Sequence, residues 1–174
     1  MESINYLKYD WERGTGAQDR ALKNKTETNR CLAFHLNKHG RGWTCAEECD
    51  LPGMVKKNRG LYEVLSSYPK KVYFDIDFHD PNEDFDEEEY LGKVIKFIQS
   101  YFPDIEFVVS GSVTSKKASF HLVSTNYKIG CEYQLNMMKI YARSMWNTYE
   151  EIDVGVYSKN RQMKLPNQSK PDKP

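Results

Sequence analysis

The sequence has no long apolar run, and polar residues follow Met1. We therefore expect no membrane-spanning helix, no secretory signal and no membrane partner. It also has only four cysteines, which outside a secretory context are expected to be reduced thiols and not a disulfide framework. These absences together predict an intracellular protein.

The chain also lacks a net charge, because 25 lysines and arginines balance 25 aspartates and glutamates. The overall charge therefore indicates no partner, and only local clusters of charge can do so. The residues are 39% hydrophobic and 13% aromatic, which argues against disorder and suffices for one domain or two small lobes. The polar tail that ends the sequence has no structural stop, so we expect 1–174 to be a fragment of a longer protein.

The stretch Val72–Phe78 predicts a strand, because β-branched and aromatic residues dominate it and alternate with acids. Side chains of a strand point to opposite faces in turn, so the apolar residues share a core face and Asp75 shares the other with Asp77. Two adjacent carboxylates repel each other unless a cation lies between them. The pair therefore indicates either a site for a hard metal ion or a strand whose acids point at water.

The pattern beyond this strand predicts an α+β fold. Further strands are expected over 105–109, 118–123 and 152–156, and helices over 84–101, capped by Asp84, and 131–149. The order strand, helix, strand, strand, helix, strand is that of a ferredoxin-like or RRM-like βαββαβ unit, here over about 70–165.

The domain organisation follows from this unit. Residues 69–174 are expected to form the RRM-like lobe, and 1–68 a smaller N-terminal α/β lobe of the same single core. In the N-terminal lobe, 31–36 predicts a strand and 61–65 a short helix. The active site is expected on the open sheet face between the two lobes.

The period-two rule brings five polar residues to that open face. In a ferredoxin-like sheet the first and third strands lie side by side and the fourth flanks the first. Alternation then puts Ser119 and His121 of the third strand, and Asp153 of the fourth, beside Asp75 and Asp77. A cluster of this kind favours a site over a solvated face.

Each residue type in the cluster suits phosphate chemistry. Three carboxylates can hold one or two Mg²⁺ or Mn²⁺ ions, and two ions about 3.5–4 Å apart stabilise an in-line phosphoryl displacement. Ser119 and His121 can donate hydrogen bonds to a polyphosphate. Basic side chains around them can neutralise a triphosphate or a nucleic-acid backbone: Lys116, Lys117, Lys159, Arg161, Lys164 and Lys170.

Three motifs in this order resemble the archaeo-eukaryotic primase superfamily, the primase-polymerases. They are the acid-x-acid strand Tyr73–Asp77, the small-x-His motif Ser119–His121 and the hydrophobic-acid pair Ile152–Asp153. The basic segment from Asp153 to Lys170 is similar to the continuation of the third motif in eukaryotic primase-polymerases and in the primase half of large-DNA-virus primase-helicases. The resemblance covers about 58–170.

The resemblance implies template-directed nucleotidyl transfer from ribo- or deoxyribonucleoside triphosphates in DNA replication. By position, Asp75, Asp77 and Asp153 would be catalytic ligands of two Mg²⁺ or Mn²⁺ ions. The residues that would bind the nucleotide are Lys117, Ser119, His121, Arg161, Lys164 and Lys170, although relatives often carry arginine where Lys164 stands. The implied partners are a single-stranded DNA template and a helicase domain or subunit outside this sequence. A nucleus, a viral replication site and the cytoplasm are all compatible locations.

Other interpretations stay open at this point. Cysteines and histidines gather at Cys31, His35, His39, Cys45 and Cys49, but their spacing fits no standard zinc module and we expect no structural zinc. An inactive or accessory relative could bind nucleotides or nucleic acid without polymerising them. A rolling-circle-type endonuclease on a similar sheet needs a second metal-binding histidine, which His121-Leu-Val123 lacks.

Overall fold

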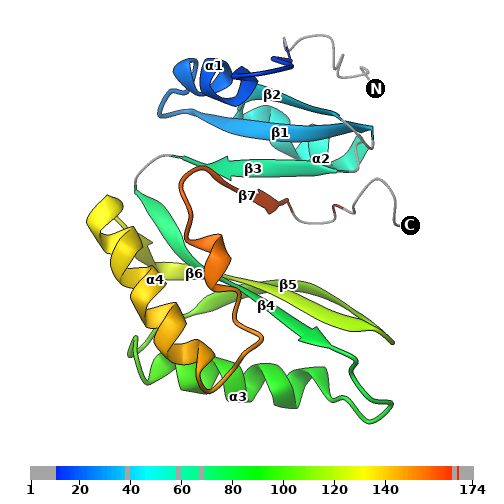
Figure 1. The fold of residues 1–174 in the computed structure, drawn as a ribbon, viewed down its shortest axis with the longest axis vertical. Coiled ribbons are helices and arrows are strands. Elements are labelled where there is room, and N and C mark those ends of the chain that lie inside the picture. Colours follow the sequence, from blue (N-terminus) through cyan, green and yellow to red (C-terminus); the bar gives the residue numbers. More distant parts are fainter. Residues whose placement is uncertain (1–10, 38–39, 58–59, 67–68, 166–167, 169–174) are drawn as a thin grey trace. The chain divides into compact units, whose positions relative to one another are not determined.

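The computed structural model describes residues 11–37, 40–57, 60–66, 69–165 and 168, and the fold is α+β, with two antiparallel sheets (Figure 1). In chain order the elements are α1 (Ala17–Lys23), β1 (Asn29–Asn37), β2 (Gly40–Glu47), α2 (Leu51–Lys57), β3 (Leu61–Leu65), β4 (Lys70–His79), α3 (Glu87–Gln99), β5 (Phe107–Thr114), β6 (Lys117–Ile129), α4 (Glu132–Trp146) and β7 (Arg161–Lys164). Short 3₁₀ helices cover Glu48–Asp50 and Val154–Val156.

The described residues group into two compact units. The first contains the residues up to Ser66 together with those from Lys159 on, and the second runs from Ser67 to Ser158. The sequence pattern predicts a single lobe for 69–174. The chain instead returns to the first unit after Ser158, because β7 pairs with β3.

The first unit is built on a sheet with the strand order β2-β1-β3-β7. The strand expected at 31–36 is confirmed as part of β1, whereas the helix expected at 61–65 is wrong, since these residues form β3. Leu61, Tyr62 and Val64 are buried, so β3 is covered on both faces between β1 and β7. A short strand buried on both faces has no alternating pattern and resembles a helix segment in sequence.

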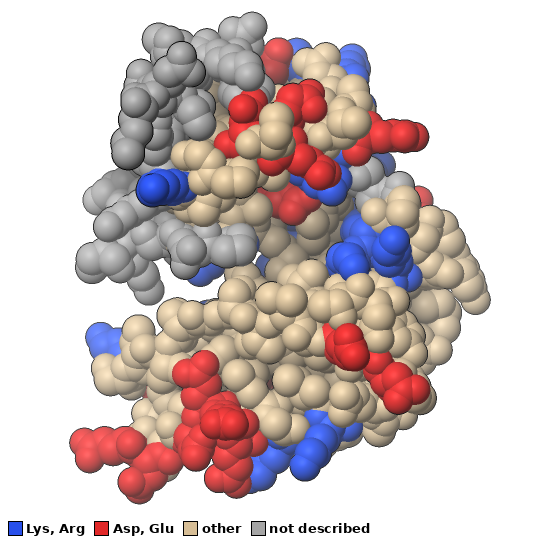
Figure 2. Space-filling model, turned by 180° about the vertical axis from the view of Figure 1, so that it is seen from behind, with Lys and Arg blue, Asp and Glu red and all other residues tan. Residues whose placement is uncertain are grey.

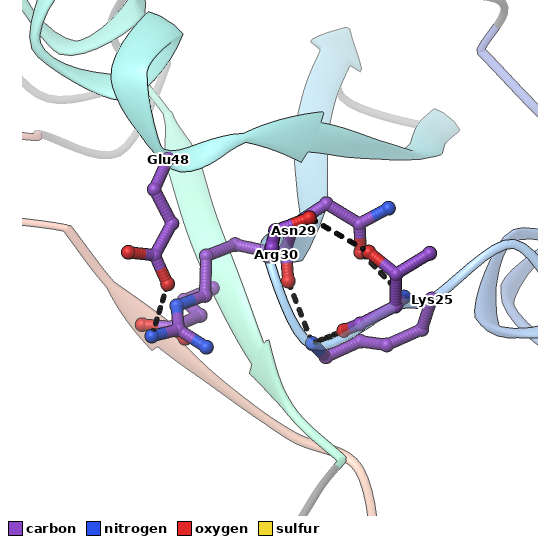
Figure 3. Close-up of polar contacts among 7 residues, drawn as sticks. Lys25, Asn29, Arg30 and Glu48 are labelled. Carbon is purple, nitrogen blue, oxygen red and sulfur yellow. Dashed lines mark hydrogen bonds and ion pairs between the residues drawn. The ribbon is translucent and has the colours of Figure 1, made fainter.

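Polar contacts in the first unit fasten the chain entering β1 (Figure 3). Lys25 Nζ donates to Asn29 O at 2.6 Å, and Thr26 N donates to Asn29 Oδ1 at 2.8 Å. Arg30 forms ion pairs with Glu48 and, at 3.7 Å, with Glu63 of β3. These bonds satisfy groups within the unit itself and therefore serve its fold.

The second unit carries the sheet with the order β4-β6-β5, and its register follows the period-two expectation. Ala118, Phe120 and Leu122 of β6 are fully buried, and Phe74 and Ile76 of β4 are buried opposite them. Tyr90 of α3 packs on Phe78 and Phe120, so this helix lies on the apolar face. The predicted separation into an apolar face and a polar face is confirmed for both strands.

The fourth strand expected at 152–156 is not formed. A single antiparallel bridge joins Ile152 to Ile76, and the chain then turns into the 3₁₀ helix Val154–Val156. The reason is local: the side chain of Asp153 accepts a hydrogen bond from Gly155 N at 2.7 Å and caps the turn. The segment still runs along the edge of β4 that β6 leaves free.

Several predicted boundaries also move. Helix α3 is capped by Asp86, which accepts from Glu89 N at 2.9 Å, and not by Asp84. Residues 110–117, which lie between two of the predicted strands, are mostly strand, since β5 extends to Thr114 and β6 begins at Lys117. Gly111 allows this close pairing, because a Cβ there would lie 2.4 Å from the ring of Phe120.

The second unit carries a group of acidic side chains at the start of α3. Figure 2 shows a group of acidic side chains on the lower part of this face and others elsewhere on it. The loop and the first turn of α3 supply Glu83, Asp84, Asp86, Glu87 and Glu88, all exposed. Acids at these positions suit the positive N-terminal end of a helix. No helix in the described part of the chain is long and apolar enough to cross a membrane.

Candidate functional site

The candidate site lies on the polar face of β4 and β6, where residues meet in register. Asp77 is paired with Ser119, Asp75 with His121, and His79 with Lys117. Antiparallel pairing puts such residues directly opposite each other, with Cβ atoms about 5 Å apart. Five of the predicted site residues are therefore brought together by the pairing of only two strands: Asp75, Asp77, Lys117, Ser119 and His121.

Asp77 is the most firmly held of these side chains. Ser119 Oγ donates to Asp77 Oδ1 at 2.8 Å, and Lys117 Nζ contacts Oδ2 at 2.7 Å. Burial of Asp77 acts to raise the pKa of its carboxyl, but the hydrogen bonds from Lys117 and Ser119 and the charge of Lys117 outweigh it and lower the pKa below its usual value. Asp77 is thus kept as a charged carboxylate.

Asp75 lies deeper on the same face. Its side chain is 17% exposed and that of His121 is 16% exposed, and Asp75 Oδ1 is 3.6 Å from His121 Nε2. This distance is longer than a direct hydrogen bond, but it allows an attraction when the imidazole is protonated. Asp75 and His121 therefore form a mostly buried polar pair on β4 and β6.

Asp153 is attached to the same strand through its backbone. Asp153 N donates to Asp75 O at 2.8 Å, and Asp77 N donates to Glu151 O at 2.8 Å. These two bonds fix the backbone of 151–153 beside the two acids of β4. Asp153, the third predicted carboxylate, therefore lies in the segment beside β4, although its side chain accepts a hydrogen bond from Gly155 N.

The polar face is less open than the sequence suggested. Tyr157 is buried, stacks on Tyr73 with ring centroids 5.3 Å apart, and donates its hydroxyl to Tyr73 O. Tyr73 OH in turn donates to Val156 O at 3.0 Å. The chain after Asp153 thus covers the Tyr73 end of the face, whereas Asp77 at the other end lines a groove.

A groove of about 540 Å³ opens at that end of the second unit. Asp77, His79 and Asp153 line it together with two residues of α4, Arg143 and Trp146. Trp146 is 44% exposed, which is high for so large an apolar side chain. Neither α4 residue was predicted from the sequence, where the available signal was a tryptophan at the C-terminal end of an amphipathic helix.

The carboxylates are chemically suited to bind a hard metal ion, but they do not form a complete coordination site. Carboxylate oxygens are the ligands that Mg²⁺ and Mn²⁺ prefer, and Asp75, Asp77 and Asp153 supply them. Among the residues that the structure describes, no group of three or more His, Cys, Asp or Glu side chains is placed to hold a metal ion. Asp77 and Asp153 share the groove, and Lys117 neutralises Asp77 there.

The remaining predicted residues fall in the first unit or beyond the described range. Arg161 and Lys164 are the two ends of β7, and Gln162 beside them accepts from Arg41 Nη1 at 2.7 Å. Lys170 lies outside the described residues.

Cys31 and Cys45 of the cysteine and histidine cluster lie on β1 and β2, and Cys49 is an exposed thiol in the 3₁₀ helix Glu48–Asp50. Cys31 is opposite Cys45, and burial raises the pKa of the Cys31 thiol to about 12. Both cysteines are free thiols, and Cys45 Sγ donates to Ala21 O at 3.2 Å. His39 and the side chain of His35 lie outside the described part of the structure. A thiol with so high a pKa is a packing group and not a reactive one.

Comparison of the sequence with models of protein families and with curated proteins gives no match. The assignment of a function therefore rests on the site itself.

Proposed function

We propose that this chain catalyses template-directed nucleotidyl transfer, as a primase or polymerase of the primase-polymerase type. The observation that carries the proposal is the convergence of Asp75, Asp77 and Asp153 on neighbouring backbone positions beside Ser119 and His121. Acids next to hydrogen-bond donors and a lysine suit a metal-bound triphosphate better than they suit stacked bases.

The fold proposed with this function is a ferredoxin-like βαββαβ unit. The sheet order β4-β6-β5 supports it, together with the bridge that puts Ile152 on the free edge of β4. In this arrangement the segment 151–153 stands for the fourth strand, shortened because Asp153 turns the chain. The polar face of β4 and β6 is then the face that helices leave uncovered.

In the proposed mechanism the protein supplies charge and alignment, and no side chain acts as a nucleophile. Asp75, Asp77 and Asp153 would hold two Mg²⁺ or Mn²⁺ ions, which when bound stabilise the attacking 3′-oxygen and the leaving pyrophosphate. Ser119 and His121 donate to phosphate oxygens. Lys117 leaves Asp77 to neutralise the triphosphate, and the lowered pKa of Asp77 keeps its carboxylate available.

The groove extends the proposed site beyond the triphosphate. Trp146 offers an exposed indole on which a nucleobase can stack, and Arg143 a guanidinium for a backbone phosphate. Stacking on a tryptophan tolerates every base, as a template-directed enzyme requires. We assign these two residues to the single-stranded DNA template or the base of the incoming nucleotide.

A second candidate, a relative that binds nucleotides without polymerising them, is favoured by one observation. Both carboxylate oxygens of Asp77 are engaged by Lys117 and Ser119, and no three-ligand group is formed in the described residues. A site in that state can hold a nucleotide through its cations while lacking the metals that chemistry needs.

One experiment separates these functions. The full chain is incubated with a primed and an unprimed single-stranded DNA, nucleoside triphosphates and Mn²⁺ or Mg²⁺, and products are resolved by length. Wild type is expected to synthesise product that Asp75→Ala abolishes, while Asp84→Ala, an exposed acid outside the site, leaves synthesis unchanged. Binding of a fluorescent triphosphate without synthesis would favour the accessory relative, and cleavage of the template would favour a nicking endonuclease.

A further inference from the structure

The edge strand β5 contains a palindromic sequence, which reads the same in both directions. In the described residues β5 pairs only with β6, so its other edge is the end of the sheet. The stretch Val109–Val113 reads Val-Ser-Gly-Ser-Val, which is the same in both directions about Gly111. If such a strand pairs antiparallel with a second copy of itself about Gly111, like residues lie opposite each other.

This edge also lacks the features that usually protect a free strand. Proteins guard exposed edges with charged residues, proline or bulges. From Phe107 to Ser115 there is no charged residue and no proline, and the pairing with β6 runs without a register shift. Val108, Val109 and Val113 are 63%, 38% and 43% exposed. Three exposed valines on an unprotected edge favour strand addition over solvation.

The charges at the two ends of β5 fit the same pairing. When Gly111 faces Gly111 of a second copy, Val109 faces Val113, Ser110 faces Ser112, and Glu106 faces Lys116 of that copy. Glu106 and Lys116 are both exposed. Each contact occurs twice because of the twofold axis, giving two cross-strand valine pairs and two ion pairs of opposite charge.

We propose that the chain forms a homodimer through antiparallel pairing of β5 with β5 of a second copy, centred on Gly111. The two three-stranded sheets then join into one continuous sheet. Because the twofold axis is perpendicular to that sheet, both polar faces, each with its Asp75 and Asp77, open to the same side. The pairing does not depend on what the polar face binds.

A charge-swap experiment tests this dimer. Sedimentation velocity over a wide range of concentration gives the dimer dissociation constant for wild type, Glu106→Lys, Lys116→Glu and the variant with both changes. Each single change puts two like-charge pairs across the twofold axis and is expected to weaken dimerisation about tenfold, and the double change to restore it to within about threefold. Lys139→Glu, an exposed lysine of α4, is the matched control for charge and is expected to leave the constant unchanged.

Folding is checked by circular dichroism, and Lys116 lies in the turn between β5 and β6, where its change disturbs no core contact. A wild type that is monomeric at every concentration would overturn the proposal. So would a dimer that neither single change weakens, or one that the double change fails to restore.

Discussion

Two acids in the middle of strands, one in each unit, have opposite electrostatic environments. Glu63 of β3 has Arg30 at 3.7 Å, and burial raises the pKa of its carboxyl, an effect that Arg30 only partly offsets. Asp77 of β4 has Lys117 at 2.7 Å and a hydrogen bond from Ser119, and its pKa is lowered in spite of burial.

These opposite environments distinguish a structural acid from a candidate functional acid. Glu63 is tolerated in its sheet as part of a network that also holds Glu48, and its environment does not favour the charge. Asp77 is held charged at the rim of a groove, where donors from β6 are directed at it. A carboxylate whose neighbours preserve its charge is the one suited to bind a cation.

The largest expected effect comes from exchanging these two acids for amides. Asp77→Asn is expected to lower the rate of template-directed synthesis on the order of a thousandfold, since it removes a charge from the reacting centre. Glu63→Gln is expected to stay within about twofold of wild type, because a neutral group suits its site. Steady-state synthesis rates check both, and equal losses in the two variants would show that Asp77 has no special role.

A smaller effect is expected from Lys117, which connects Asp77 to the phosphates. Lys117→Met is expected to weaken triphosphate binding by about tenfold to a hundredfold, the loss of a charged hydrogen bond, while Lys117→Arg retains most of the affinity. Lys128→Met, an exposed lysine further along β6, is the matched control. Affinities are measured by fluorescence anisotropy, and tighter binding in Lys117→Met would mean that the lysine serves only to neutralise Asp77.

The next effect concerns the groove. Trp146→Ala is expected to weaken binding of single-stranded DNA or nucleotide by roughly fivefold to tenfold, since stacking of a base on an aromatic ring contributes about 1–3 kcal/mol. Tyr133→Ala removes another exposed aromatic from α4, outside the groove, and should change nothing. Filter binding measures both variants. Identical affinities for the two would remove Trp146 from the proposed site.

The smallest expected effect is on the pH dependence of the free energy of unfolding, measured in metal-free buffer. The pKa of Asp77 is lowered in the folded state. Its contribution to stability is therefore present above the unfolded value near 3.8 and is lost as the pH falls through the folded pKa. The folded pKa of Glu63 is raised, so its contribution falls as the pH rises from the unfolded value near 4.5 through the folded pKa. Asp77→Asn should therefore cost stability at neutral pH and not in acid.

Glu63→Gln should change in the opposite sense, gaining stability relative to wild type as the pH rises. Thermal melts of both variants and wild type between pH about 3 and about 7 measure these two slopes. Slopes of the same sign in the two variants would contradict the difference between the acids.

Much of the site could be predicted because a strand alternates with a period of two. That rule alone put Asp75, Asp77, Ser119 and His121 on one face, and the pairing of β4 with β6 confirms it. The shortened fourth strand could not be predicted, since it depends on Asp153 capping Gly155, a contact between neighbours that competes with sheet pairing.

Other features depended on contacts between residues distant in the sequence. The return of β7 to the first unit rests on four residues without an alternating pattern, which pair with β3 almost a hundred positions earlier. The cover of Tyr157 over Tyr73 requires the turn after Asp153, and the groove requires the end of α4 to lie beside that turn. Local patterns carry no information about such pairings.

Asp75 and Asp77 are proposed to hold a divalent cation together with a triphosphate. Mn²⁺ binding to the full chain, measured by electron paramagnetic resonance with a non-hydrolysable nucleoside triphosphate present, tests this. Wild type and Glu63→Gln are expected to bind Mn²⁺ alike beyond what the nucleotide alone binds, and Asp75→Asn and Asp77→Asn to lose that binding while staying folded. Equal Mn²⁺ binding in all four proteins, or none in wild type, would contradict the account.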